Sequence, residues 1–102
     1  MQHIISMSEM VGAIRDNGAT AQVYATADAT YDPAADKVSV ALGSFARKMA
    51  SSGNGAHPPP WLPPAEDVHE HLAQNEAADF AKEVFVTWVK KVRDSIPHDL
   101  LA

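Results

Sequence analysis

The chain has 102 residues, enough for one domain and too few for two of ordinary size, and 18 of its apolar residues are alanine, so the expected core is small. The absence of cysteine excludes disulfides and thiolate chemistry, and a net charge of −5 argues against a nucleic-acid partner. No apolar run reaches membrane-spanning length and the N-terminus has no secretory pattern, so we expect a cytoplasmic protein with no membrane partner.

A helix is expected near the N-terminus. Ser6 and Glu9 have the spacing of a capping box, in which each side chain accepts a hydrogen bond from an amide of the first turn. Apolar residues then recur at intervals of three and four, as on one face of a helix: Met7, Met10, Val11 and Ile14. Gly18 stands where a left-handed cap would end this helix, and residues 2–5 before it fit a short strand.

An antiparallel β-hairpin is expected over residues 20–45. Apolar and polar residues alternate in both arms, with these apolar positions: Val23, Ala25, Ala27, Ala29, Tyr31, Val38, Val40 and Leu42. Residues 32–36 between the arms hold a proline and two aspartates, which are typical of a turn. The alanines of the first arm would also suit a helix, but the strict alternation and the threonines between them favour a strand.

A long helix is expected at the C-terminal end, because nothing between Pro64 and Ser95 breaks a helix and Pro97 ends it. Large apolar residues step by fours along one ridge: Val68, Leu72, Phe80, Val84, Trp88, Val92 and Ile96. A helix of about 30 residues would be roughly 45 Å long, which exceeds the body of a small domain. We therefore expect it either to break near Gln74 and Asn75 or to extend beyond the domain and contact a partner.

The connection between hairpin and long helix is rich in proline. Residues 45–52 are predicted to form one or two helical turns, followed by a connecting loop over residues 52–64. Within it, residues 57–64 read HPPPWLPP and hold five of the seven prolines. Such a segment fits a ligand for an SH3 or WW domain, a flexible linker, or a strap that packs on its own domain.

The strap is the favoured interpretation of this segment. A flexible linker has no use for Trp61 and Leu62, and ligands for peptide-binding domains usually lie in disordered tails. Exposure of a tryptophan is costly, so we expect both side chains to pack on the protein's own apolar surface. The expected neighbours of Trp61 are Phe80 or Val84 of the long helix, or the inner face of the hairpin.

His69 and His71 are the main candidates for a metal site. On a helix, residues two apart point about 200° away from each other, so the pair could not bind one ion. His57 or His98 would have to complete a site across the fold. We therefore predict no metal ion and no cofactor.

Motifs of catalysis are also missing from the sequence. It contains no Gly-x-Ser-x-Gly turn, no His-Glu-x-x-His helix and no phosphate-binding loop, so no catalytic residue is assigned. Carboxylates that the fold brings together leave no trace in a sequence. An enzyme therefore stays open as the alternative to a binding protein.

These patterns predict an α+β fold in a single small domain, residues 1–102, with an N-terminal helix, an antiparallel β-hairpin, a Pro-rich strap and a long C-terminal helix. Apolar residues surround most of the C-terminal half of that helix, which predicts a homodimer through these residues: Phe85, Trp88, Val89 and Val92. The predicted function is that of a small, non-enzymatic, cytoplasmic regulatory or adaptor protein, of the kind that phages and mobile elements encode, which binds an unidentified protein partner. The alternative is a small enzyme or small-ligand-binding protein with a pocket between the hairpin and the long helix.

Overall fold

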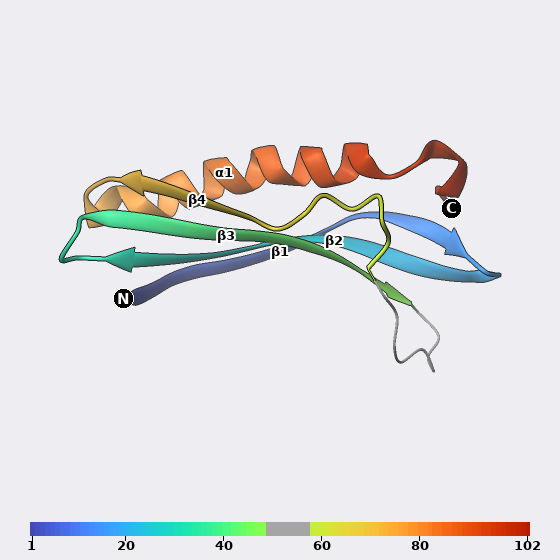
Figure 1. Ribbon diagram of the computed structural model, residues 1–102, viewed down its shortest axis with the longest axis horizontal. Helices are drawn as coiled ribbons and strands as arrows, with labels where there is room; N and C mark the ends of the chain where they lie inside the picture. The colour runs from blue at the N-terminus through green and yellow to red at the C-terminus, as the bar shows by residue number, and fades with distance from the viewer. Residues whose placement is uncertain (49–57) are drawn as a thin grey trace.

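The structure is a computed structural model that describes residues 1–48 and 58–102. Its elements follow one another as β1 (Gln2–Asp16), β2 (Ala19–Asp32), β3 (Lys37–Lys48), β4 (Glu66–His71), α1 (Gln74–Ser95) and the short 3-10 helix η1 (His98–Leu100). The strands form one antiparallel sheet in the order β1-β2-β3-β4, so each strand pairs with the next one in the chain. α1 runs along one face of this sheet (Figure 1). The α+β character is confirmed.

The N-terminal helix predicted from Ser6 to Gly18 is wrong, because these residues belong to a hairpin of β1 and β2. Asn17 and Gly18 form its turn, with φ angles of 49° and 81°. Two left-handed residues make the turn that best matches the twist of a hairpin, and Asn-Gly is the most favoured pair for it. The left-handed conformation expected at Gly18 is present, but it joins two strands instead of ending a helix.

A β-bulge explains why the apolar spacing in β1 imitates a helix. The pairing of β1 with β2 shifts register between Met10 and Gly12. One extra residue reverses the alternation, so the residues on the α1 side are odd-numbered from Ile5 to Glu9 and even-numbered after the bulge. The apolar or small positions on that side are Ile5, Met7, Gly12 and Ile14. Of the residues from which the helix was predicted, Met7 and Ile14 lie on the α1 side, Met10 lies on the opposite side and Val11 is the unpaired residue of the bulge. Their intervals of three and four therefore combine two faces of a strand and do not mark one face of a helix.

The hairpin of β2 and β3 is confirmed, with a turn between Asp32 and Lys37. In this turn the Asp32 carboxylate accepts a hydrogen bond from the Ala34 amide at 3.0 Å. β2 presents a column of alanines to the helix, and Ala25, Ala27 and Ala29 are all at most 3% exposed. Their small side chains let α1 approach the middle of the sheet closely, which explains the alanine content of this strand.

The C-terminal helix is confirmed, but it begins later than Pro64. α1 has 22 residues and starts at Gln74, one of the two residues near which a break was expected. Of the two preceding residues that continued the apolar ridge, Val68 belongs to β4 and pairs with Val40 of β3, and Leu72 lies between β4 and α1. Pairing with an exposed strand edge outweighed the helical periodicity of this short stretch.

The helical turns predicted for residues 45–52 are wrong for residues 45–48, which continue β3. The rest of that prediction, and the first part of the connecting loop, lie in residues 49–57, outside the described residues. Residues 58–65 form an irregular segment between β3 and β4, as expected for a connecting loop.

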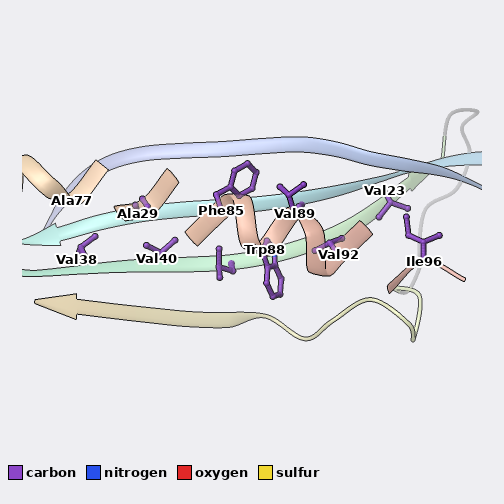
Figure 2. Packing of buried hydrophobic residues seen from close by; sticks show 14 of the residues in the cluster. Val23, Ala29, Val38, Val40, Ala77, Phe85, Trp88, Val89, Val92 and Ile96 are labelled. Carbon is purple, nitrogen blue, oxygen red and sulfur yellow. The ribbon is translucent and has the colours of Figure 1, made fainter. Parts of the chain in front are cut away.

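The core lies between α1 and the face of the sheet that it covers (Figure 2). The buried residues of α1 are Ala77, Ala81, Phe85, Trp88, Val89 and Val92. They pack on the alternate residues of β2 and β3 that point towards the helix, of which Val23, Val38 and Val40 are fully buried. Among the described residues, no helix or strand covers the opposite side of the sheet, which we call the open face (Figure 1).

Candidate functional site

The open face is organised in rows that cross the sheet, because directly paired residues of antiparallel strands project on the same side. From the Asn17–Gly18 turn outward, the strand register gives these rows: Ala13, Gln22 and Arg47; Met10, Tyr24 and Phe45; Ser8, Thr26 and Gly43; Ser6, Asp28, Ala41 and Asp67; His3, Thr30, Ser39 and His69. The second row is large and apolar, the third is small, and the fourth is acidic. Raised, hollow and charged strips therefore lie next to one another.

The row of Met10, Tyr24 and Phe45 forms a ridge, which we call the aromatic ridge. The rings of Tyr24 and Phe45 stack with their centroids 5.1 Å apart and their planes 12° from parallel. Since paired strands lie about 4.8 Å apart, the ring planes face each other along the row and the rings stand upright on the sheet. Met10 and Phe45 are 50% and 40% exposed. Upright rings present their edges to solvent, which does not suit stacking of a sugar or a nucleobase.

A shallow depression of about 530 Å³ lies beside the ridge. Its lining on the open face consists of small or short side chains, namely Ser6, Ser8, Thr26, Asp28, Ala41 and Gly43. A β-carbon added at Gly43 would lie 3.1 Å from Thr26 Oγ1, so the missing side chain helps to keep this region low. The depression is on the far side of the sheet from α1. The space between hairpin and helix, where the alternative prediction placed a pocket, is filled by core side chains such as Phe85 and Trp88.

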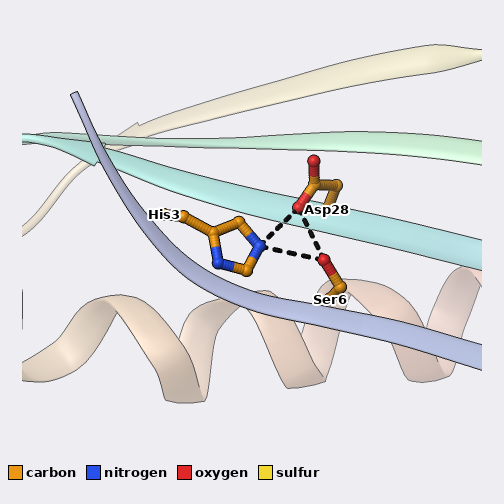
Figure 3. Close-up of polar contacts among 3 residues, drawn as sticks. All are labelled: His3, Ser6 and Asp28. Atoms are coloured by element: carbon orange, nitrogen blue, oxygen red, sulfur yellow. Dashed lines mark hydrogen bonds and ion pairs between the residues drawn. The ribbon is translucent and has the colours of Figure 1, made fainter.

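His3, Ser6 and Asp28 meet at the edge of the depression (Figure 3). His3 Nε2 lies 2.8 Å from Asp28 Oδ1 and 2.9 Å from Ser6 Oγ, and Ser6 Oγ donates to Asp28 Oδ1 at 2.9 Å. In a catalytic triad the two nitrogens of the imidazole serve different partners, one the carboxylate and the other the hydroxyl. Here a single nitrogen contacts both groups and the serine proton is directed at the aspartate. The arrangement therefore cross-links β1 and β2 and does not activate the serine.

His69 and His71 lie on β4, so the helical geometry used to separate them does not apply. On a strand, residues two apart point to the same face. His69 Nδ1 lies 2.9 Å from Ser39 Oγ, and His71 Nδ1 lies 3.2 Å from the Ala35 carbonyl. No group of three or more metal-binding side chains occurs in residues 1–48 and 58–102. His57 is outside the described residues, and His98 lies in η1 at the other end of α1.

The predicted dimer residues Phe85, Trp88, Val89 and Val92 are all buried between α1 and the sheet, with at most 8% of each exposed. Trp88 also donates a hydrogen bond from Nε1 to the Gly43 carbonyl at 2.8 Å. Four strands cover more of the helix than the two-stranded hairpin expected from the sequence. These side chains therefore need no second chain to cover them, and the oligomeric state stays a prediction.

Trp61 and Leu62 are half-buried and pack against the core. Trp61 borders a cavity of about 360 Å³ together with Ile14, Ala21 and Ala46, near the Asn17–Gly18 turn. That is the inner face of the sheet, one of the two expected locations, at the end far from Phe80. The strap prolines and Leu62 border a second cavity with Gly43 and Ser44 of β3, beyond the last residue that pairs with β4. Because proline has no amide hydrogen, these residues cover the edge of β3 without extending the sheet.

The surroundings of Tyr31 shift its pKa. Burial raises the pKa of its phenol above the ordinary value of 10.0, and the hydrogen bond to Asp36 and the negative charges of Asp36 and Asp32 raise it further. Tyr31 Oη lies 2.7 Å from the Leu72 carbonyl and 3.1 Å from Asp36 Oδ1. The contact joins β2 to the segment that leads into α1. It lies on the α1 side of the sheet and has a structural role.

Two charged residues beside the ridge and the depression, Arg47 and Asp67, have no ion-pair partner in the described parts of the chain. Arg47, next to the aromatic ridge, is exposed, and so is Asp67 in the acidic row. Asp28 is paired with His3. Neither Arg47 nor Asp67 was predicted from the sequence, because polar positions opposite the core of an alternating strand are usually solvated. The signal that could have found the ridge is an aromatic residue on the polar side of both arms of the hairpin, Tyr24 and Phe45.

Within the described residues, no helix combines the length and the apolar character that crossing a membrane requires. The chain matches no family model, no curated protein and no solved structure. Functional conclusions therefore depend on the geometry of the chain itself.

Proposed function

We propose that the chain is a small, non-enzymatic regulatory or adaptor protein of the cytoplasm that binds a protein partner through the open face of its sheet. The observation that carries the proposal is the aromatic ridge, a continuous apolar row across three strands on a face that no described helix or strand covers. Single apolar residues on a surface are common, but a contiguous apolar patch usually marks a binding site.

The composition of this surface supports a protein partner over other ligands. Tyrosine, phenylalanine and methionine are enriched in the centres of protein interfaces, where charged residues are depleted. The charged side chains Arg47, Asp28 and Asp67 lie to either side of the ridge and the depression, as expected for a polar rim. The rings stand upright, which disfavours stacking on a sugar or base, and the net charge of −5 disfavours nucleic acid.

The test is site-specific photo-crosslinking in cells that express the protein naturally. A photoreactive amino acid replaces Thr26, at the centre of the depression, and a second protein carries it at Lys82 on the exposed side of α1. We expect a discrete crosslinked protein band from position 26 and none of the same mass from position 82. Phe45→Ser should abolish this band, because it removes an exposed part of the ridge.

The matched control is Val86→Ser, which removes an apolar side chain that is 56% exposed on α1, away from the open face. It should leave the band from position 26 unchanged. The proposal is refuted if position 26 yields no protein band, or if Phe45→Ser and Val86→Ser affect the band equally. A metabolite that copurifies with the protein and is displaced by Phe45→Ser would instead support the small-ligand alternative.

A further inference from the structure

We infer that the partner of the open face is a second copy of this chain, packed face to face with its strands reversed. This inference rests on the proposed function, since it identifies the occupant of the same surface. Its basis is that the open face is complementary, in shape and in charge, to a second copy of the same face that is rotated by 180° about a two-fold axis.

The required axis lies between the two faces, parallel to the rows, and passes between the aromatic ridge and the depression. This rotation places each strand over the same strand of the partner and exchanges the rows on either side of the axis. It puts the three large residues of the ridge, Met10, Tyr24 and Phe45, over the three small residues of the next row, Ser8, Thr26 and Gly43. On every strand, a large side chain therefore meets a small one.

The fit between these rows is one of shape. The upright rings of the ridge stand next to a depression of about 530 Å³. In the second copy the order of the two is reversed, so the ridge of each copy lies over the depression of the other. Two sheets that pack face to face lie about 10 Å apart with interdigitated side chains. A ridge that faced another ridge would hold the sheets apart, whereas a ridge over a depression fills the space on both sides of the axis.

The same rotation matches the charges. It exchanges the row that contains Arg47 with the acidic row, so Arg47 of each copy lies over Ala41 of the other, between Asp28 and Asp67. Arg47 and Asp67 are both exposed, and neither has an ion-pair partner in the described parts of one chain. In the dimer each of them gains a partner of opposite sign, and the two-fold axis doubles the number of pairs.

The area available to this interface is small. A strand stretch of twelve residues is about 40 Å long and three strands are about 14 Å wide, which gives roughly 1,100 Å² for both copies together. This is near the lower limit for a specific interface, so the dimer should dissociate in the micromolar range and its population should depend on concentration.

The experiment is sedimentation equilibrium of the purified chain from about 1 to 200 μM, a range that brackets such an affinity. The wild-type mass should rise from the 10.9 kDa of one chain towards twice that value. Phe45→Ser and Ser8→Tyr, which remove part of the ridge and fill part of the depression, should each weaken association at least about tenfold. Val86→Ser on α1 should not. Circular dichroism verifies that each variant is folded.

A charge exchange then tests the orientation. Arg47→Glu and Asp67→Arg should each weaken the dimer by about tenfold, and the double variant should recover to within about threefold of the wild type, because opposite charges face each other again. The inference is overturned if the wild type stays monomeric, if the dimer tolerates Ser8→Tyr, or if the double variant is not rescued. A monomeric chain whose position 26 crosslinks to a different protein in cells would overturn this inference and leave the proposed function intact.

Discussion

Replacement of Trp88 by phenylalanine tests how the helix is attached to the sheet. Trp88 is 2% exposed, and its Nε1 donates to the Gly43 carbonyl at 2.8 Å. This carbonyl lies one residue past Leu42, the last residue of β3 that pairs with β4, and the neighbouring strap residues include prolines, which have no amide hydrogen to offer. The indole is therefore the group that satisfies the exposed edge of β3 at this point.

The expected loss follows from two contributions. A carbonyl left without its donor in a dry environment costs about 1–3 kcal/mol, and the smaller ring leaves a gap that costs about 1 kcal/mol more. The free energy of unfolding should fall by roughly 2–4 kcal/mol, a large share of the stability of a domain of this size. For about 100 residues, such a loss lowers the melting temperature by about 8 °C or more.

The measurement is urea unfolding followed by circular dichroism, in Trp88→Phe and in the matched variant Trp61→Phe. Trp61 is also an indole that contacts the core, but it is only half-buried and its ring nitrogen has no hydrogen-bond partner in the described residues. We expect Trp61→Phe to cost less than half as much as Trp88→Phe. A loss below about 0.5 kcal/mol for Trp88→Phe would refute the importance of this hydrogen bond, since that is the scatter of neutral substitutions.

Three further predictions concern the strap, a tyrosine and the histidines. Trp61→Ala should lower the free energy of unfolding by about 2–3 kcal/mol in thermal melts, because a half-buried indole leaves the core, and an unchanged melting temperature would contradict the strap. The raised pKa of Tyr31 means that folding favours the neutral phenol, so its contribution to stability is complete below the ordinary value of 10.0 and is lost as the pH rises towards the folded pKa. Urea titrations should therefore show a smaller loss of stability above pH 10.0 for Tyr31→Phe than for the wild type, and parallel losses would refute this. Chelation should leave the melting temperature of untagged protein unchanged, and a drop of several degrees would show that a metal ion stabilises the fold.

The sequence was most informative where one pattern held over a whole element. The alternation in β2 and β3 predicted both strands and their turn, because neither strand contains a bulge and the register runs without a shift from Asp32 to Ala21. The helix was also predictable from the ridge of large residues between Phe80 and Ile96. In each case the period of the apolar residues matches the period of the backbone throughout.

The incorrect predictions concern stretches in which the period of the apolar residues changes or in which the element is too short to show a period. In β1 a bulge after Met10 reverses the alternation, and the resulting spacing matched a helix better than a strand. In β4 a single paired apolar residue, Val68, was too little to distinguish a strand from the first turns of a helix. Those two strands are the outer strands of the sheet, and they pair with β2 and β3. Without them, the predicted sheet was too narrow to cover the apolar side chains of the helix.

The candidate site was not predictable for a related reason. Tyr24 and Phe45 are 21 positions apart in the sequence and become neighbours only through the register of the hairpin. The depression depends on β1 as well, because Ser6 and Ser8 line one side of it. A sequence in which residues 6–17 were interpreted as a helix could not place these side chains on the same surface.

The position of α1 after all four strands has a consequence for synthesis of the protein. Each strand can pair with the preceding one as it leaves the ribosome, but the helix that covers the sheet is translated after them. During that interval the inner face of the sheet is in contact with water and with other nascent chains. One of its two central strands, β2, presents alanines at positions 25, 27 and 29, which expose far less apolar area than leucine or valine would. The same small side chains that admit the helix in the finished protein thus reduce the risk of aggregation while the chain is still being made.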